Sequence, residues 1–324
     1  MLSAAAGAVV LTAPAAVAEP VGGDDPAATR ARVDRLYAEA ERATEKYNAA
    51  AERVESLREQ VERAQDGAAR DQARVNRMRG ALGALASAQY RSGGTAPALA
   101  LLLAEDPEEY LARAAVLDRI NDRQAARLRT FRQAARSLEQ RRAEARGQLA
   151  ELERRRETLR RHRTSVQRKL GAAQRLLNRL PSREREAREH ASRGTGRDLL
   201  GTPPVPGGMS PRAAAAVAAA RRAVGSPYAW GQAGPHAFDC SGLTHWAYGR
   251  AGVALPRTSQ GQLHAGRRVP LDQALPGDLV VYRQDASHVG MYAGGGQVVH
   301  APYPGARVRY DPVGMMPVAA VVRP

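Results

Sequence analysis

The residue best suited to covalent chemistry is Cys240, the only cysteine among the 324 residues. It stands in the stretch AFDCSGLTHWAYGRAG, where loop residues give way to apolar and aromatic residues spaced three and four apart. That spacing predicts a helix that begins at the cysteine. Free N–H groups and the dipole of a helix N-terminus favour a thiolate, so the position suits a nucleophile. A lone buried cysteine is more often inert, and the cysteine by itself does not decide between these interpretations.

A nucleophilic thiol needs a base and a group that orients the base. His288 opens one predicted strand, residues 288–294, and His300 lies in the next, residues 296–302. Three consecutive glycines between them predict a tight hairpin. Because six residues lie on each side of Gly294 and strand side chains alternate, we expect the two histidines roughly opposite each other on one face. One would then take the thiol proton while the other fixes its tautomer.

The elements that would position these residues form an α+β domain over residues 212–324. Its first helix lies in SPRAAAAVAAARRAVG, with Ser210 as the N-cap and Pro211 at the first helical position. After the cysteine helix, a meander of strands is predicted at residues 278–283, 288–294, 296–302 and 306–312.

The sequence of residues 27–192 predicts a long helical region that differs from the α+β domain. Apolar residues recur at alternating steps of three and four from Val33 to Leu85, with only Asp71 breaking the stripe, and again from Tyr110 to Leu180. This spacing is typical of a coiled coil, and the simplest arrangement is an antiparallel hairpin whose second arm starts at Asp106 and Pro107. Polar residues weaken the seam of that second arm, so we expect another chain or the C-terminal domain to cover part of it: Asn121, Gln124, Arg142, Arg156 and Arg163.

The two ends of the helical region have their own composition. Residues 1–18 are apolar, rich in small residues and end in an A-x-A site, which predicts a secretory signal that lacks the usual basic start. Residues 193–211 are rich in glycine and proline without periodicity, which predicts a linker.

The charge of the chain favours a polyanionic environment without selecting one. Its 49 lysines and arginines against 33 aspartates and glutamates give a formal net charge of +16. No zinc-finger, RRM or helix-turn-helix signature accompanies this charge, so we do not expect nucleic acid as a partner. Anionic wall polymers and simple solvation of long helices explain it equally well. No grouping has the spacing of a zinc site, and we expect no metal and no cofactor.

Four motifs follow one another along the second half of the chain: FDCSGL, LPRTSQGQ, LPGDLVVY and HVGMYAGGGQVVHAP. Their order and spacing resemble the NlpC/P60 family of papain-like cysteine peptidases over about residues 210–324. The resemblance implies a papain-like α+β catalytic domain preceded by the coiled-coil hairpin. It implies Cys240 as nucleophile, His288 as base and His300 as the orienting third residue. It also implies that Tyr228, in GSPYAWG, lies near the oxyanion.

The resemblance carries five more positions to the substrate side. Asp239 and Ser241 flank the nucleophile, and the family motif RTSxxQ is matched by Arg257, Ser259 and Gln262. A structural hydrogen-bonding role for Arg257 and Gln262 is at least as well supported, and both interpretations stay open.

Members of the family cleave peptidoglycan stem peptides, typically between D-glutamate and meso-diaminopimelate. The resemblance therefore implies a secreted cysteine endopeptidase of the cell wall that acts through a thioester, with peptidoglycan as substrate. We expect the helical region to position or restrain the enzyme, or to contact a membrane-associated cell-division regulator. The alternatives are a coiled-coil scaffold or hydrolase activator whose C-terminal domain only binds the wall, and acyl transfer or amide hydrolysis on another substrate.

Overall fold

A computed structural model describes residues 26–91, 106–183 and 209–324. The predicted signal, residues 1–18, lies outside these ranges, as does most of the predicted linker, residues 193–211. The chain divides into two compact units, one made of Met1–Ala43 with Ser165–Pro324 and the other of Thr44–Thr164. No helix in the described ranges has the length and apolar character needed to cross a membrane.

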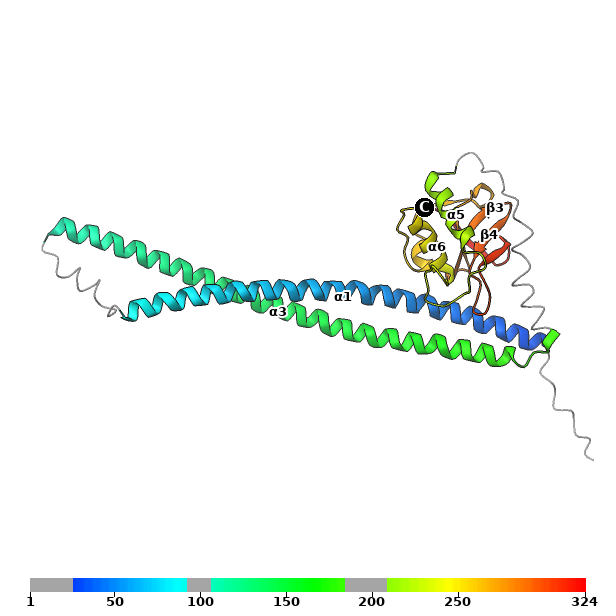
Figure 1. Cartoon of the computed structure of the whole chain (residues 1–324), viewed down its shortest axis with the longest axis horizontal. Helices are drawn as coiled ribbons and strands as arrows, with labels where there is room; N and C mark the ends of the chain where they lie inside the picture. The colour runs from blue at the N-terminus through cyan, green and yellow to red at the C-terminus, as the bar shows by residue number, and fades with distance from the viewer. Residues whose placement is uncertain (1–25, 92–105, 184–208) are drawn as a thin grey trace, which may run out of the picture. The chain divides into compact units, whose positions relative to one another are not determined.

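Two long helices form the predicted antiparallel hairpin, α1 (Pro26–Arg91) and α3 (Pro107–Leu177) (Figure 1). The start of α3 is as predicted, because Asp106 Oδ1 accepts a hydrogen bond from the backbone N–H of Glu108 at 3.0 Å and Pro107 is the first helical residue. A proline at this position is tolerated because the first N–H groups of a helix have no partner within it.

Within Thr44–Thr164 the two arms are joined by a thin apolar seam and by polar pairs. Leu57, Val61 and Leu152 form a small buried cluster. Asp71, the charged residue in the predicted apolar stripe, pairs with Arg141 at 2.9 Å, with the Arg141 side chain 53 % exposed. The polar break in the stripe is therefore matched from the opposite arm. Winding of the arms as a coiled coil stays a prediction, as does the covering of the second arm by another chain.

The C-terminal domain is a six-stranded antiparallel sheet with helices on one side. Its elements are α5 (Pro211–Arg222), α6 (Cys240–Arg250), α7 (Ser259–Gln262), β1 (Arg267–Val269), the 3-10 turn η1 (Leu271–Gln273), β2 (Leu279–Tyr282), β3 (His288–Gly294), β4 (Gln297–His300), β5 (Arg309–Pro312) and β6 (Val318–Arg323). The strand order is β1-β6-β2-β3-β4-β5. Ser210 accepts a hydrogen bond from Ala213 N and caps α5, as predicted.

The predicted meander is correct for β2 to β5 and incomplete at the other edge. β6 returns to lie between β1 and β2 and pairs with both. Neither strand was predicted, because the three residues of β1 are too few to show a period and β6 (VAAVVR) lacks a clear alternation of apolar and polar residues.

An apolar cluster lies on each face of the sheet. The alternation along β2 directs Leu279 and Val281 into the main core, while Val280 and Tyr282 belong to a second cluster. The main core also contains side chains of α5 and α6, which lie beside one another next to β3 (Figure 1). Cys240 and Val289, the residue that follows His288, are members of this same cluster.

Candidate active site

Cys240 is the first residue of α6, as the sequence predicts. The helix begins there because Asp239 has extended backbone geometry and its Oδ1 accepts a hydrogen bond from Gly242 N at 2.7 Å. The thiol is 2 % exposed, and its Sγ lies 3.8 Å from Ser259 Oγ. The sulfur is thus held at the N-terminal end of a helix, where free N–H groups and the helix dipole stabilise negative charge.

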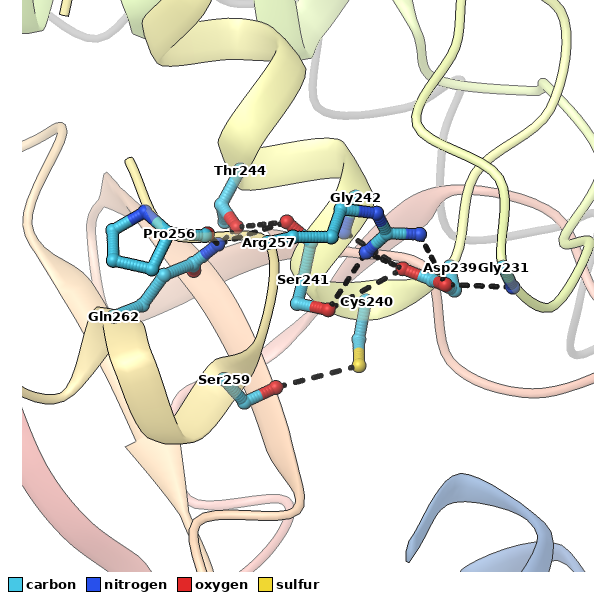
Figure 2. A network of polar contacts seen from close by, with 10 residues as sticks. All are labelled: Gly231, Asp239, Cys240, Ser241, Gly242, Thr244, Pro256, Arg257, Ser259 and Gln262. Atoms are coloured by element: carbon cyan, nitrogen blue, oxygen red, sulfur yellow. Dashed lines mark hydrogen bonds and ion pairs between the residues drawn. The ribbon is translucent and has the colours of Figure 1, made fainter. Parts of the chain in front are cut away.

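Asp239 holds the start of α6 in place through a buried ion pair, shown in Figure 2. Arg257 Nη1 and Nη2 donate to Oδ1 and Oδ2 of Asp239 at 2.9 and 2.7 Å, and Gly231 N donates to Oδ2 at 2.8 Å. The two parallel hydrogen bonds between guanidinium and carboxylate fix the direction of both side chains. The Asp239 carboxylate is 0 % exposed. Both residues therefore position the nucleophile, and their predicted contact with substrate stays a prediction.

Gln262 ties the same helix to the following loop (Figure 2). Its Nε2 donates to Ser241 O and to Pro256 O, both at 2.9 Å, and its Oε1 accepts from Thr244 Oγ1 at 2.6 Å. The side chain is completely buried. These bonds favour the structural role for Gln262 that the sequence left open.

Ser241 and Ser259 are the remaining two predicted substrate-side residues. Ser241 Oγ accepts a hydrogen bond from Arg257 Nη1 at 3.1 Å, and Ser259 Oγ is the neighbour of the sulfur already described. Both serines are fully buried. The structure thus brings all five predicted substrate-side residues around Cys240, and the substrate contacts themselves remain predicted.

A chain of hydrogen bonds leads away from His288. His288 Nε2 lies 2.8 Å from His300 Nδ1, and His300 Nε2 lies 2.8 Å from Asp311 Oδ2. Arg309 Nε donates to the same Asp311 oxygen at 2.8 Å. Both histidines are buried, at 0 % and 1 % exposure, so water does not compete for these bonds.

The chain assigns a tautomer to each imidazole. Asp311 as a carboxylate only accepts, so His300 donates through Nε2 and its Nδ1 becomes the acceptor. His288 then donates through Nε2, which leaves its Nδ1 as the basic nitrogen. The predicted orienting role of His300 thus has a geometric basis, and Asp311 extends it by one residue.

The pKa values of the outer two groups agree with this assignment. Burial and the neighbouring His288 lower the pKa of His300 to about 4, outweighing the hydrogen bond and charge of Asp311, which raise it. Burial raises the pKa of Asp311, but its hydrogen bonds and charge interactions with His300 and Arg309 bring it below the usual value of 3.8. A neutral imidazole therefore lies against a carboxylate, as the tautomer chain requires.

The register of the β3–β4 hairpin corrects one detail of the sequence prediction. Met291 pairs with Val299, and a shift near Gly294 alters the count across the turn. Continuing the pairing sets His300 beside Gly290 rather than beside His288, so the two histidines are diagonal neighbours on one face. A Cβ at Gly290 would lie 3.2 Å from His300 Cβ, so the glycine leaves room for the imidazole.

The basic nitrogen of His288 faces a carboxylate from the N-terminal helix. Glu41 Oε1, on α1 and in the same compact unit, lies 3.3 Å from His288 Nδ1, which has no well-directed hydrogen bond within the described ranges. Glu41 Oε2 accepts a hydrogen bond from Arg283 Nη1. Burial raises the pKa of Glu41, but the opposing pull of His288 and Arg283 lowers it below 4.5. A carboxylate only accepts hydrogen bonds, so the two groups attract each other when His288 Nδ1 carries a proton, and a protonated Nδ1 cannot take the thiol proton.

Asp311, Glu41 and Arg283 were not identified from the sequence. Asp311 can be placed only once the pairing of His300 with Arg309 across β4 and β5 is known, because it lies two residues from Arg309 and so shares its face. Glu41 and Arg283 had no signal in the sequence, since the two residues that meet there are 242 positions apart in the sequence.

Tyr228 is 7 % exposed and lies in the apolar cluster that contains Cys240, and its role at the oxyanion stays a prediction. Among the residues that the structure describes, no three His, Cys, Asp or Glu side chains are grouped so as to hold a metal ion.

The family model of NlpC/P60 matches residues 225–319, a stretch that contains the cysteine, both histidines and Asp311. This stretch is an NlpC/P60 domain. The predicted fold class is confirmed: an NlpC/P60 α+β domain preceded by a long helical hairpin.

Similar proteins share this domain. A probable endopeptidase of Mycobacterium tuberculosis is 47 % identical over 108 residues, which are 33 % of this chain and 28 % of that protein. A probable endopeptidase of Corynebacterium glutamicum is 46 % identical over 109 residues, 34 % of this chain and 52 % of the other. The solved peptidoglycan hydrolase RipB of Mycobacterium tuberculosis is 32 % identical, with a TM-score of 0.33, over 35 % of this chain and 64 % of that one. The chain thus spans about half or less of the length of the two probable endopeptidases.

Proposed function

We propose that this protein is a cysteine endopeptidase that cleaves peptidoglycan stem peptides, at the bond between D-glutamate and meso-diaminopimelate. The observation that carries the proposal is the buried chain from His288 through His300 to Asp311. It leaves a basic nitrogen on the first residue of β3, a strand that packs against the helix begun by Cys240. The family and the names of its relatives supply the substrate class.

The residues divide the reaction into two steps. The Cys240 thiolate attacks the peptide carbonyl, and His288, having taken the thiol proton, gives it to the leaving amine. Water, activated by His288, then hydrolyses the thioester and restores the thiol. Backbone N–H groups at the start of α6 and Tyr228 would stabilise the oxyanion in both steps.

Substitution of the nucleophile tests the proposal directly. Purified wild type, Cys240→Ala and Cys240→Ser are compared for release of stem-peptide fragments from peptidoglycan, with products identified by mass spectrometry. We expect both variants to lose at least about 10⁴-fold in rate, as is usual when a catalytic nucleophile is removed. His264→Ala, at an exposed loop histidine, is the control and should cleave normally.

The same measurement separates the alternatives. Equal release by wild type and both Cys240 variants would leave a scaffold or hydrolase activator as the function. Activity that depends on Cys240 but yields products other than cut stem peptides would mean acyl transfer or amide hydrolysis on another substrate.

The helical region is proposed to restrain the enzyme, and Glu41 supplies the means. A carboxylate against His288 Nδ1 occupies the nitrogen that must receive the thiol proton. Glu41→Gln in the full chain is expected to raise activity about tenfold. The neutral amide cannot form a charge-assisted bond with a protonated His288 Nδ1, so this nitrogen is left available to take the thiol proton. Glu52→Gln, at an exposed position of the same helix, is the control. No gain from Glu41→Gln would refute the restraint.

We also propose that the protein is secreted to the cell wall and that its hairpin contacts a membrane-associated regulator. Support for a contact comes from apolar side chains left exposed on the arms, among them Tyr90, Leu111 and Val116. Fractionation of cells producing the tagged chain tests the location. Crosslinking from these three positions tests the contact, and Leu111→Ser should abolish it.

A further inference from the structure

Arg283 is a charged residue that the mechanism does not use and that binds the same Glu41 carboxylate as His288. It follows β2 and has a left-handed backbone, with φ 62°. Its Nη1 donates to Ser287 Oγ at 3.2 Å and to the Glu41 carboxylate, and its side chain is 25 % exposed. The guanidinium is therefore fixed from its own loop and directed to a point beside His288.

The Glu41 carboxylate, to which Arg283 is directed, is almost completely shielded from water. Glu41 is 4 % exposed, and its two oxygens are divided between Arg283 and His288 Nδ1. A buried carboxylate is stable only with a cation close by, and Arg283 is the permanent cation of the pair. The loop thus holds a cation that can bind an anion, and one carboxylate group is long enough to contact both this cation and His288 Nδ1.

A stem peptide carries free carboxylates at matching places. When D-glutamate is linked through its side chain, its α-carboxylate is free and lies three carbons from the scissile carbonyl, on the acyl side. The diamino acid carries a second free carboxylate, at the far end of its side chain on the amine side. A carboxamide in place of either group is neutral and cannot form an ion pair.

We propose that Arg283 binds a free carboxylate of one of the two residues joined by the scissile amide, and that Glu41 occupies this position until substrate replaces it. Arg283 is then a specificity residue that selects stem peptides with a carboxylate over those with a carboxamide. The inference rests on the proposed function. It concerns a residue outside every motif that identified the family.

The test compares Glu41→Gln with the double variant Glu41→Gln, Arg283→Gln in the full chain, so that the restraint is already removed from both. Three synthetic stem peptides serve as substrates: one with both carboxylates free, one amidated on D-glutamate and one amidated on the diamino acid. In the Glu41→Gln protein, amidation at one of the two positions should lower kcat/KM by about 10- to 100-fold, mainly through KM, since a charge-assisted bond is lost. The position that responds identifies the carboxylate.

Arg283→Gln should lower kcat/KM for the free peptide by a similar factor and change cleavage of the responding amidated peptide less than about twofold, because the amide has no charge to lose. Arg283→Lys should restore part of the preference, and Arg268→Gln, at an exposed arginine of β1, should keep all of it. Preference that survives Arg283→Gln in a folded protein would overturn the inference. Loss of cleavage of all three peptides with Cys240 intact would overturn it too, since that is the result of a structural role. Cleavage by Cys240→Ala would refute the proposed function instead.

Discussion

The ion pairs of the C-terminal domain and those of the hairpin segment Thr44–Thr164 differ in their exposure to water. In the domain, Asp239, Gln262 and His288 are completely buried and are held by hydrogen bonds or ion pairs. In the hairpin segment, pairs such as Arg58 and Glu62 lie on the surface, with side chains 57 % and 61 % exposed. Burial strengthens each polar interaction and makes an unpaired group costly, whereas water screens the surface pairs. We therefore expect the buried polar groups of the C-terminal domain to contribute more to stability and activity than the exposed pairs of the hairpin segment. Four predictions test this difference.

The largest effect on folding is expected for Arg257→Gln. It leaves the Asp239 carboxylate buried without its cation, which typically costs about 3–5 kcal/mol of unfolding free energy. Chemical denaturation of the variant and of Arg268→Gln, the exposed arginine, measures the difference. A change below about 1 kcal/mol, the usual value for surface pairs, would remove the contrast between the two regions.

Asp311→Asn is expected to lower kcat about 100-fold, at the low end for general-base catalysis, because the amide can present a donor to His300 and disturb the tautomer of both histidines. Asp285→Asn, on the loop before β3, is the control. The pH dependence of kcat distinguishes loss of histidine orientation from misfolding. A changed tautomer shifts the apparent pKa of the general base in that profile, whereas misfolding lowers kcat equally at every pH. An unchanged profile and rate would mean that His300 is oriented without Asp311.

Acid should destabilise the folded protein through His300. Its pKa of about 4 in the folded state lies below the unfolded value of 6.5, so the unfolded chain binds more protons between these values. The contribution is complete above pH 6.5 and is lost as pH falls toward 4, about 2 kcal/mol between pH 7.5 and pH 5. Urea unfolding at both pH values should show this loss in wild type. His300→Asn should show a smaller one, and equal losses would contradict the assignment.

The smallest effect is expected in the hairpin. Asp71→Ala should change unfolding free energy by less than about 1 kcal/mol, because its partner Arg141 is half exposed. Leu152→Ala, in the thin apolar seam, should cost about 2–4 kcal/mol. If the two substitutions were equally costly, the hairpin would depend on its ion pairs as the C-terminal domain does.

The sequence by itself determined much of the local structure. Residue spacing predicted that α6 begins at Cys240, that Ser210 caps α5, and that two long arms form a hairpin, since caps, proline and periodicity act over a few residues. The same alternation predicted His288 and His300 on one face of neighbouring strands. Motif order then indicated the family.

Tertiary structure decided how the site is completed. The turn between β3 and β4 shifts the register and sets the histidines diagonally, which a count of residues does not reveal. β6 inserts between β1 and β2 because pairing depends on the whole sheet. Asp311 and Glu41 reach the two histidines only through strand pairing and a contact across most of the chain. Such contacts depend on which surfaces bury one another, and no local pattern of residues encodes that choice.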